Sequence, residues 1–341
     1  MTRLAALRFW LRHRRYSLWI IAATVLASCD ADSPSVFEPQ GHGANQIATL
    51  GWILFAIAAV VYVAVIGLLL AALFRYRRAS PEIQRETPPG SHAFILVSGV
   101  AVPAVILGAV FGMTLHTMNQ MVPPGQSNPL TIEVIGKQWW WDVRYPDYDV
   151  TTANEIHIPA GEPVQIQLNA ADVIHSFWVP ELHGKIDLIP GQTNTIWIQA
   201  DEPGEYLGLC SEFCGMQHAH MQFLVIADEP DEFARWLELQ QQPAPEPTDA
   251  LTLRGREIFL GSACVYCHTI EGTNATSDLG PDLTHFASRR TIGAGAVPNT
   301  RGHLAGWIID SQSIKPGNRM PPMYMNSEDL QALLAYMDTL R

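Results

Sequence analysis

Residues 210–221 read Cys-Ser-Glu-Phe-Cys-Gly-Met-Gln-His-Ala-His-Met. Two thiols stand four residues apart, at Cys210 and Cys214, and an imidazole follows at His218 and a thioether at Met221. One loop can therefore direct all of these groups at a single point. Soft sulfur ligands together with imidazole select copper, zinc or iron–sulfur clusters over magnesium and calcium. The stretch therefore predicts a transition-metal site, and it sets the interpretation of the residues around it.

Short strands surround this loop in the pattern of residues 130–227. Three runs alternate apolar and polar residues as half-buried strands do: 131–135, 164–168 and 195–198. Proline–glycine pairs at 190–191 and 203–204 mark turns between strands. The region therefore predicts an all-β sandwich or Greek-key barrel. A strand-flanked loop that supplies Cys, His and Met resembles the copper loops of cupredoxins, which implies a cupredoxin-like Greek-key sandwich. His175, which follows Asp172-Val173-Ile174, is the candidate for a further metal ligand from an earlier strand.

The loop and the earlier histidine resemble the binuclear copper (CuA) site of subunit II of the haem–copper cytochrome c oxidases. The second thiolate carries the resemblance, because two bridging sulfurs can hold two copper ions that share one electron. The resemblance implies two bridging thiolates, one imidazole for each copper, a thioether and a backbone carbonyl: Cys210, Cys214, His175, His218, Met221 and Glu212. A structural zinc site and a disulfide between the two cysteines are the alternatives.

Neighbouring residues extend the resemblance. In the run from Gln138 to Asp142, Trp139 matches the family's electron-entry residue, whereas the next two tryptophans fit a strand of the core. The Glu212 carboxylate matches a ligand to magnesium shared with the catalytic subunit I. One departure stands out, because Leu96 occupies the position of a membrane glutamate near a proton pathway. His92 is the nearest ionisable residue, so a role in proton entry is in doubt.

A second motif, Cys264-Val265-Tyr266-Cys267-His268, is the attachment signature of c-type haem. Its surroundings resemble a class I cytochrome c, an all-α fold. The resemblance implies thioether bonds from Cys264 and Cys267, with His268 as proximal iron ligand. Met320, which precedes a proline, is the expected distal ligand, with Met323 and Met325 as alternatives. A Met/His pair raises the haem potential, as an electron carrier to an oxidase requires.

The N-terminal residues carry export signals. Residues 1–16 hold five arginines and no acid, and an apolar run of about ten residues, the length of a signal-peptide core, leads to Leu26-Ala27-Ser28-Cys29. That string resembles a bacterial lipobox. Residues 1–28 are therefore expected to be a removed signal peptide and Cys29 a lipidated first residue. An ordinary signal sequence with a chance cysteine is the alternative.

Two charge-free runs, 47–74 and 93–115, are long enough to cross a bilayer. Pro103 is expected to kink the second. The loop 75–92 holds four arginines and the segment 29–46 holds no lysine or arginine. The positive-inside rule places the loop in the cytoplasm and the later domains on the outer face of a bacterial inner membrane.

Composition bounds the partners. The 341 residues are 48% apolar and 16% charged, with a formal charge of −12 and a mean hydropathy of +0.07. This excludes a disordered protein, and an acidic chain without a basic stripe argues against nucleic acid. Without residues 1–28 and the basic loop, the outer-face part has a net charge of −19. Such a surface would attract a basic soluble cytochrome, less so at high salt.

The expected organisation follows from these segments: signal peptide 1–28, outer-face segment 29–46, membrane helices 47–74 and 93–115 around the loop 75–92, copper domain 116–228, helix and proline-rich linker 229–249, and cytochrome c domain 250–341. The hypothesis is an electron-entry subunit II of a bacterial cytochrome c oxidase with a fused haem domain. Its partners would be subunit I and subunit III, and its donor a cytochrome c or an upstream quinol–cytochrome c reductase. The alternatives are a subunit of a nitric oxide reductase and a copper-delivery lipoprotein. The copper cysteines argue against a quinol oxidase subunit.

Overall fold

The computed structural model describes residues 34–78, 90–121 and 129–341. The expected signal peptide at 1–28, the expected lipidation site at Cys29 and most of the expected loop at 75–92 lie outside these ranges.

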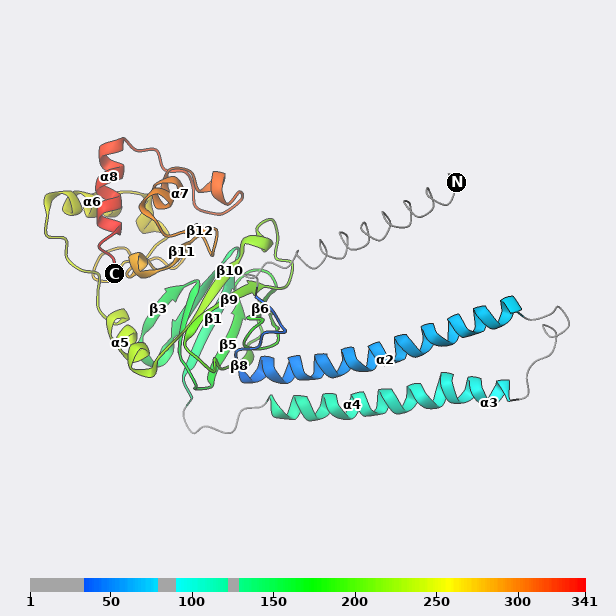
Figure 1. The fold of residues 1–341 in the computed structure, drawn as a ribbon. Coiled ribbons are helices and arrows are strands. Elements are labelled where there is room, and N and C mark those ends of the chain that lie inside the picture. Colours follow the sequence, from blue (N-terminus) through cyan, green and yellow to red (C-terminus); the bar gives the residue numbers. More distant parts are fainter. Residues whose placement is uncertain (1–33, 79–89, 122–128) are drawn as a thin grey trace, which may run out of the picture. The chain divides into compact units, whose positions relative to one another are not determined.

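Two long apolar helices lie side by side (Figure 1). The first is α2 (His42–Arg78), and the second combines α3 (Ser91–Leu96), the π-helical turn η2 (Val97–Ala101) and α4 (Val102–Gln120). Both are long and apolar enough to cross a membrane, which agrees with the two apolar segments of the sequence. The second departs from α geometry just before Pro103, as expected where proline withholds an amide proton from the helix.

The start of α2 is hydrogen-bonded to the β-rich region. The Gln40 amide donates to the Glu181 carbonyl at 2.7 Å, and the Ala44 amide to the Leu182 carbonyl at 3.0 Å. A Cβ at Gly41 would lie 2.0 Å from the Gln199 carbonyl oxygen, so only glycine allows this approach. The base of the first apolar helix is therefore held against the domain that carries the predicted metal loop.

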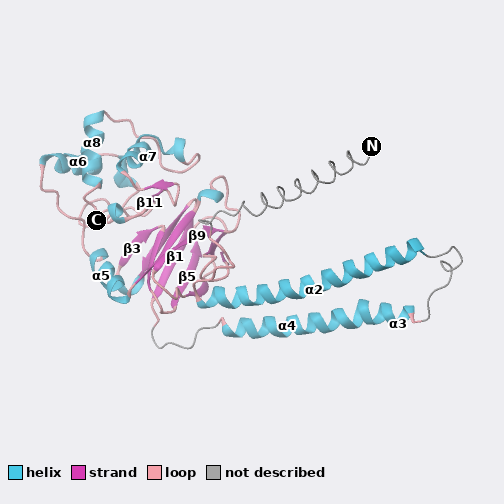
Figure 2. Cartoon of the chain, viewed as in Figure 1, coloured by secondary structure: helices cyan, strands magenta, loops and turns pink. Residues whose placement is uncertain are grey.

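Two five-stranded sheets form a sandwich, which confirms the predicted fold class (Figure 2). One sheet runs β3-β2-β1-β5-β8: Val150–Ala153, Trp140–Tyr145, Thr131–Lys137, Val164–Ala170 and Asn194–Ile198. The other runs β4-β10-β9-β6-β7: Glu155–Pro159, Gln222–Asp228, Gly204–Cys210, His175–Trp178 and Ile186–Leu188. β1 pairs parallel with β5 and β4 pairs parallel with β10, and the other pairs are antiparallel. All three runs predicted as strands are strands.

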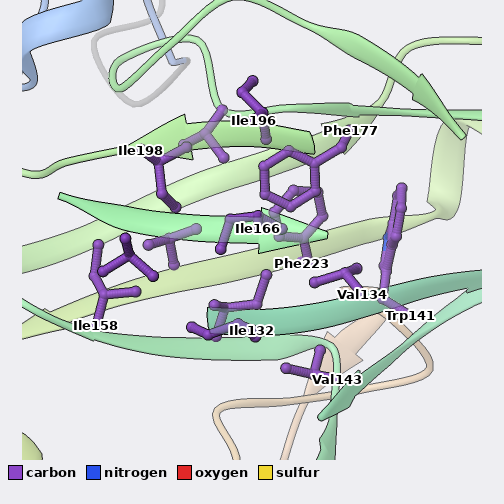
Figure 3. Close-up of a cluster of buried hydrophobic side chains, with 14 of the residues drawn as sticks. Ile132, Val134, Trp141, Val143, Ile158, Ile166, Phe177, Ile196, Ile198 and Phe223 are labelled. Carbon is purple, nitrogen blue, oxygen red and sulfur yellow. The ribbon is translucent and has the colours of Figure 1, made fainter. Parts of the chain in front are cut away.

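The inner faces of the two sheets pack into one apolar core (Figure 3). Strand β1 alternates buried and half-buried residues along its length, as its sequence pattern predicts. Trp141 is fully buried and meets the Phe223 ring edge-on at 5.0 Å, and Phe223 stacks on Phe177 at 4.6 Å. The cluster packs against β6, which begins at His175. Strand β6 pairs directly with β9, which ends at Cys210, and this pairing sets the spacing of the two positions.

Helices dominate the remainder of the chain, after α5 (Pro230–Gln240). They are α6 (Ala250–Leu260), α7 (Arg301–Ile314) and α8 (Ser327–Met337), with a small pair of strands, β11 (Thr291–Ile292) and β12 (Val297–Pro298). Helices α6 and α8 cross at Gly255, where a Cβ would lie 2.0 Å from the Ala332 carbonyl oxygen. Leu333, Tyr336 and Met337 belong to the separate core of this region.

The proline-rich segment after α5 is attached to the helical region. The His285 ring bonds the Gln242 carbonyl at 3.0 Å and the Arg341 carbonyl at 2.9 Å. The Ala244 amide donates to the Glu271 carbonyl at 3.3 Å. His285, which had no role in the sequence, therefore joins the linker to the C-terminal residue.

Candidate copper and haem centres

The two cysteines of the metal loop face each other at the end of β9. Their sulfur atoms are 3.7 Å apart, well beyond the length of about 2 Å of a disulfide bond. Both side chains are buried. The hydrogen bond from Cys214 and the facing His175 ring lower the pKa of the Cys210 thiol against the opposing effect of burial. The pair can therefore present a thiolate, the form that binds metal.

The other predicted ligand atoms converge on these two sulfurs. Nδ1 of His175 lies 3.9 Å from the Cys210 sulfur, and the Glu212 carbonyl oxygen lies 3.3 Å from it. Nδ1 of His218 and the Met221 sulfur lie 3.7 and 3.8 Å from the Cys214 sulfur. The structure therefore brings together all six predicted donors. The neighbouring His220 instead bonds the Gln217 side-chain oxygen at 2.8 Å.

This donor set fits a pair of copper ions. Each cysteine sulfur has its own imidazole nitrogen, and each has one further weak donor. A structural zinc site needs four ligands around one ion, whereas here six donors are arranged about two sulfurs. The His175, Cys210 and Cys214 donor atoms lie within 4.8 Å of one another, close enough to hold metal.

Asp172 orients the copper histidine of β6, and the sequence did not identify this role. Its carboxylate oxygen lies 2.9 Å from Nε2 of His175, which leaves Nδ1 directed at sulfur. The same carboxylate accepts the Gln138 amide at 2.7 Å. Burial raises the pKa of Asp172, but hydrogen bonds from His175, Gln138 and Val173 outweigh burial and lower it. An aspartate three residues before a predicted ligand was the available signal, because ligand histidines commonly donate their second N–H to a carboxylate.

Trp139 lies directly beside the copper loop. Its indole Nε1 donates to the Cys214 carbonyl at 3.0 Å, and the Gln138 side-chain amide donates to the same oxygen at 2.8 Å. The next tryptophan, Trp140, lies under the Lys137 ammonium at 4.7 Å, and Trp141 is in the core. Trp139 therefore contacts the copper loop from the turn that precedes β2, whereas Trp140 and Trp141 belong to the strand.

A cavity of about 640 Å³ occupies the helical region. Both cysteines of the second motif line it, together with the predicted proximal histidine and two of the three methionines: Cys264, Cys267, His268, Met320 and Met323. Nδ1 of His268 bonds the Pro281 carbonyl at 2.7 Å, which reserves Nε2 for another partner. A Cβ at Gly280 would lie 2.8 Å from the His268 ring, so glycine is needed there.

The cavity fits a haem with acidic side chains. Its lining is largely aromatic and aliphatic, and Arg289 lines it while being only 8% exposed. The Nε of Arg289 has no hydrogen-bond partner within the part of the chain that the structure describes. A carboxylate inside the cavity would satisfy this buried donor.

Of the two candidate axial methionines that line the cavity, Met320 has the more firmly fixed backbone. Its carbonyl accepts from Ser311 at 2.8 Å and from Gln312 at 3.0 Å, and its amide donates to Asn318 at 2.8 Å. Met323 packs against the helical core through its side chain.

Two neighbouring residues, Gln138 and Trp139, connect the copper loop to the haem cavity. Both line the cavity, and the side chain of each donates a hydrogen bond to the Cys214 carbonyl. A continuous covalent and hydrogen-bonded path therefore joins the wall of the cavity to Cys214, one of the predicted copper ligands.

Comparisons with known proteins match this architecture. Residues 149–228 match the family model "Cytochrome C oxidase subunit II, periplasmic domain", and residues 252–341 match "Cytochrome c". The chain is 33% identical to cytochrome c oxidase subunit 2 of Alkalihalophilus pseudofirmus, over 98% of this chain and 99% of the relative. The corresponding protein of Bacillus sp. PS3 is 30% identical over 96% and 97%. A solved periplasmic domain of subunit II of cytochrome oxidase from Bradyrhizobium japonicum is 36% identical, covering 36% of this chain and 97% of that one with a TM-score of 0.33.

Proposed function

Because the chain belongs to the family of cytochrome c oxidase subunit 2, we propose that it carries electrons from its own covalently bound haem c to a binuclear CuA centre and on to subunit I, the site of O2 reduction. The observation that carries the proposal is the convergence of three sulfur donors, two imidazoles and one backbone carbonyl beside Trp139, which also lines the haem cavity. The copper pair would supply a rigid centre that shares one electron, and the haem a one-electron carrier of raised potential.

The ligand assignments belong to this proposal. Cys210 and Cys214 bridge the coppers, and His175, His218, Met221 and the Glu212 carbonyl complete the set. Cys264 and Cys267 hold the haem covalently, with His268 and Met320 as axial ligands. Asp172 keeps Nδ1 of His175 turned to sulfur, and the Pro281 carbonyl keeps Nε2 of His268 turned into the cavity. Trp139 joins the two sites.

The membrane helices and the outer domains give the chain its place in the complex. Two apolar helices and a periplasmic-type domain fit a membrane protein of a haem–copper oxidase. We further assign it two spans in the bacterial inner membrane, a lipid on Cys29, and magnesium shared with subunit I through the half-buried Glu212 carboxylate. A cavity of about 680 Å³ beside the copper loop, lined by Ile47 of α2 and by His218, is a suitable contact face for subunit I. The further partners that we propose are subunit III and a cytochrome that donates electrons.

Electron paramagnetic resonance with metal counting on the full chain tests the copper centre. We expect two coppers per chain sharing one unpaired electron, and loss of that signal in Cys214→Ser with the haem absorption unchanged. A mononuclear copper spectrum, or bound zinc, would overturn the proposal.

Optical spectra of two methionine variants test the haem assignment. Met320→Ala is expected to lose the methionine–iron charge-transfer band, whereas Met323→Ala, the matched control from the same cavity, is expected to retain it. Persistence of the band in Met320→Ala would show that another group is the distal ligand.

A further inference from the structure

A buried lysine joins the haem domain to the copper domain. Lys315, at the end of α7, lies beside the haem cavity, yet its ammonium group bonds backbone atoms of both domains. It donates to the Trp139 carbonyl at 2.8 Å and the His220 carbonyl at 2.8 Å in the copper domain. Its third bond goes to the Gly293 carbonyl of the haem domain, at 2.6 Å.

These three bonds use the full donor capacity of an ammonium group. The Lys315 residue is only 2% exposed, so water does not replace any of the three acceptors. Burial lowers the pKa of Lys315 to about 7. A buried cation is costly unless it is hydrogen-bonded, and separating the domains would remove two of its three partners. The hydrogen bonds of Lys315 therefore stabilise the docked state of the two domains relative to the separated state.

Further contacts lie around Lys315. The Gln217 side chain donates to the Pro316 carbonyl at 2.6 Å, and the Gln222 amide donates to the Ala294 carbonyl at 3.0 Å. At the margin, Arg290 and Glu205 form an ion pair at 3.0 Å in which both side chains are about half exposed. Exposed pairs of this kind contribute little to stability. Two more hydrogen bonds join the domains: the buried Glu155 carboxylate accepts the Arg290 amide at 2.5 Å, and Lys137 donates to the Asp278 carbonyl at 3.0 Å. Lys315 differs from these contacts because one buried side chain bonds both domains at once.

Net charge does not explain the docking. Residues 250–341 contain eight basic and eight acidic residues, whereas residues 129–249 contain four basic and 20 acidic ones. The haem domain is thus electrically neutral and the copper domain carries the acidity of the outer-face part. Long-range attraction between them is weak, which leaves short-range contacts to set the orientation.

We propose that Lys315 is a positioning residue that locks the haem domain onto the copper domain, with Trp139 held as part of the haem cavity wall. The inference rests on the proposed function for the use of this path by electrons, but the docking itself does not depend on it. Internal electron transfer then occurs from one fixed orientation. The linker at 241–249 connects the domains without having to move.

The test compares Lys315→Met with Arg290→Gln in the full, metal- and haem-loaded chain. Met keeps the length of the side chain but has no donors, and Arg290→Gln removes the exposed contact between the same domains. In Lys315→Met we expect the rate of amide hydrogen exchange to rise about tenfold or more at residues 139–141 and 291–295. The electron paramagnetic resonance spectrum of copper and the optical spectrum of haem should be unchanged. Arg290→Gln is expected to exchange as wild type. Unchanged exchange in Lys315→Met would overturn the proposal.

A longer linker gives a second test that keeps Lys315 in place. Flexible residues are inserted after Pro247, and the haem-to-copper transfer rate is measured after flash reduction of the haem. With Lys315 present, we expect the rate to be independent of linker length. In the Lys315→Met background, it should fall with each extension as the effective concentration falls. A wild-type rate that falls with linker length would overturn the fixed docking. An absence of any internal transfer in the wild type would instead count against the proposed function.

Discussion

Gly136→Ala should damage the copper site while changing only one hydrogen to a methyl group. Gly136 lies in β1, and a Cβ at this position would lie 2.7 Å from Cδ2 and 3.0 Å from Cγ of His175. Carbon atoms pack at about 3.5 Å or more, so the imidazole ring has to yield by about 0.8 Å. The ring has little room, because His175 is fully buried and bonded to Asp172 at 2.9 Å.

The magnitude follows from this geometry. Overpacking in a dense core costs about 1–3 kcal/mol of unfolding free energy. Nδ1 of His175 must turn away from the Cys210 sulfur or break the bond to Asp172. A disturbed ligand orientation typically lowers metal affinity by about 10–100-fold. We therefore expect both a moderate loss of stability and a specific loss of copper.

The assay separates these two effects by means of a control. Copper affinity is measured by competition with a chelator, and the copper resonance spectrum is recorded at saturation. Ile158→Ala, in the same core but on β4, opens a cavity and costs about 2–5 kcal/mol. This control should keep wild-type copper affinity despite its lower stability. Wild-type affinity and spectrum in Gly136→Ala would refute the assignment of His175, and equal losses in both variants would show that general destabilisation is responsible.

Three further predictions test other parts of the molecule. Asp172→Asn should lower copper affinity by about 10–100-fold in the same chelator assay, with little change in the haem spectrum, because the amide no longer fixes His175 as a carboxylate does. Gly255→Ala should lower the thermal unfolding midpoint of the haem domain by the equivalent of about 1–3 kcal/mol, because the added methyl group meets the Ala332 carbonyl, even though alanine is the better helix former. Its control, Gly302→Ala, has open space around it and should be neutral or stabilising. The reverse order of stability would contradict the packing argument. Metabolic labelling with a palmitate analogue should mark the wild type and not Cys29→Ser. An unlabelled wild type would refute the proposed lipidation of Cys29.

Much of the copper site could be predicted because its ligands are local. Five of the six donors lie within 12 consecutive residues, where spacing alone indicates convergence. His175 required the family resemblance, since its position beside Cys210 results from the pairing of β6 with β9. Trp139 also required the resemblance, since strand alternation alone would place its side chain on the same face as that of Trp141, which is in the core.

The contacts between domains could not be predicted in this way. Lys315 lies 176 residues from Trp139 and bonds only to backbone carbonyls, which leave no mark in a sequence. Arg289 and Asp172 act through burial and through a single neighbour, and neither forms a periodic pattern. The sequence also placed the acidity on the outer-face part as a whole, whereas most of it belongs to the copper domain.

The lock at Lys315 also ties the unfolding of the two domains together. A domain that is bound on one side cannot unfold without breaking that binding, so each domain adds its docking free energy to the stability of the other. Such coupling is reciprocal: the docking free energy that the folded copper domain adds to the haem domain equals the one that the folded haem domain adds to the copper domain. Calorimetry should therefore record one cooperative transition, and two in a chain that lacks the lysine. Incorporation of haem would then raise the unfolding free energy of the copper domain without any change in the ligands of its metal site.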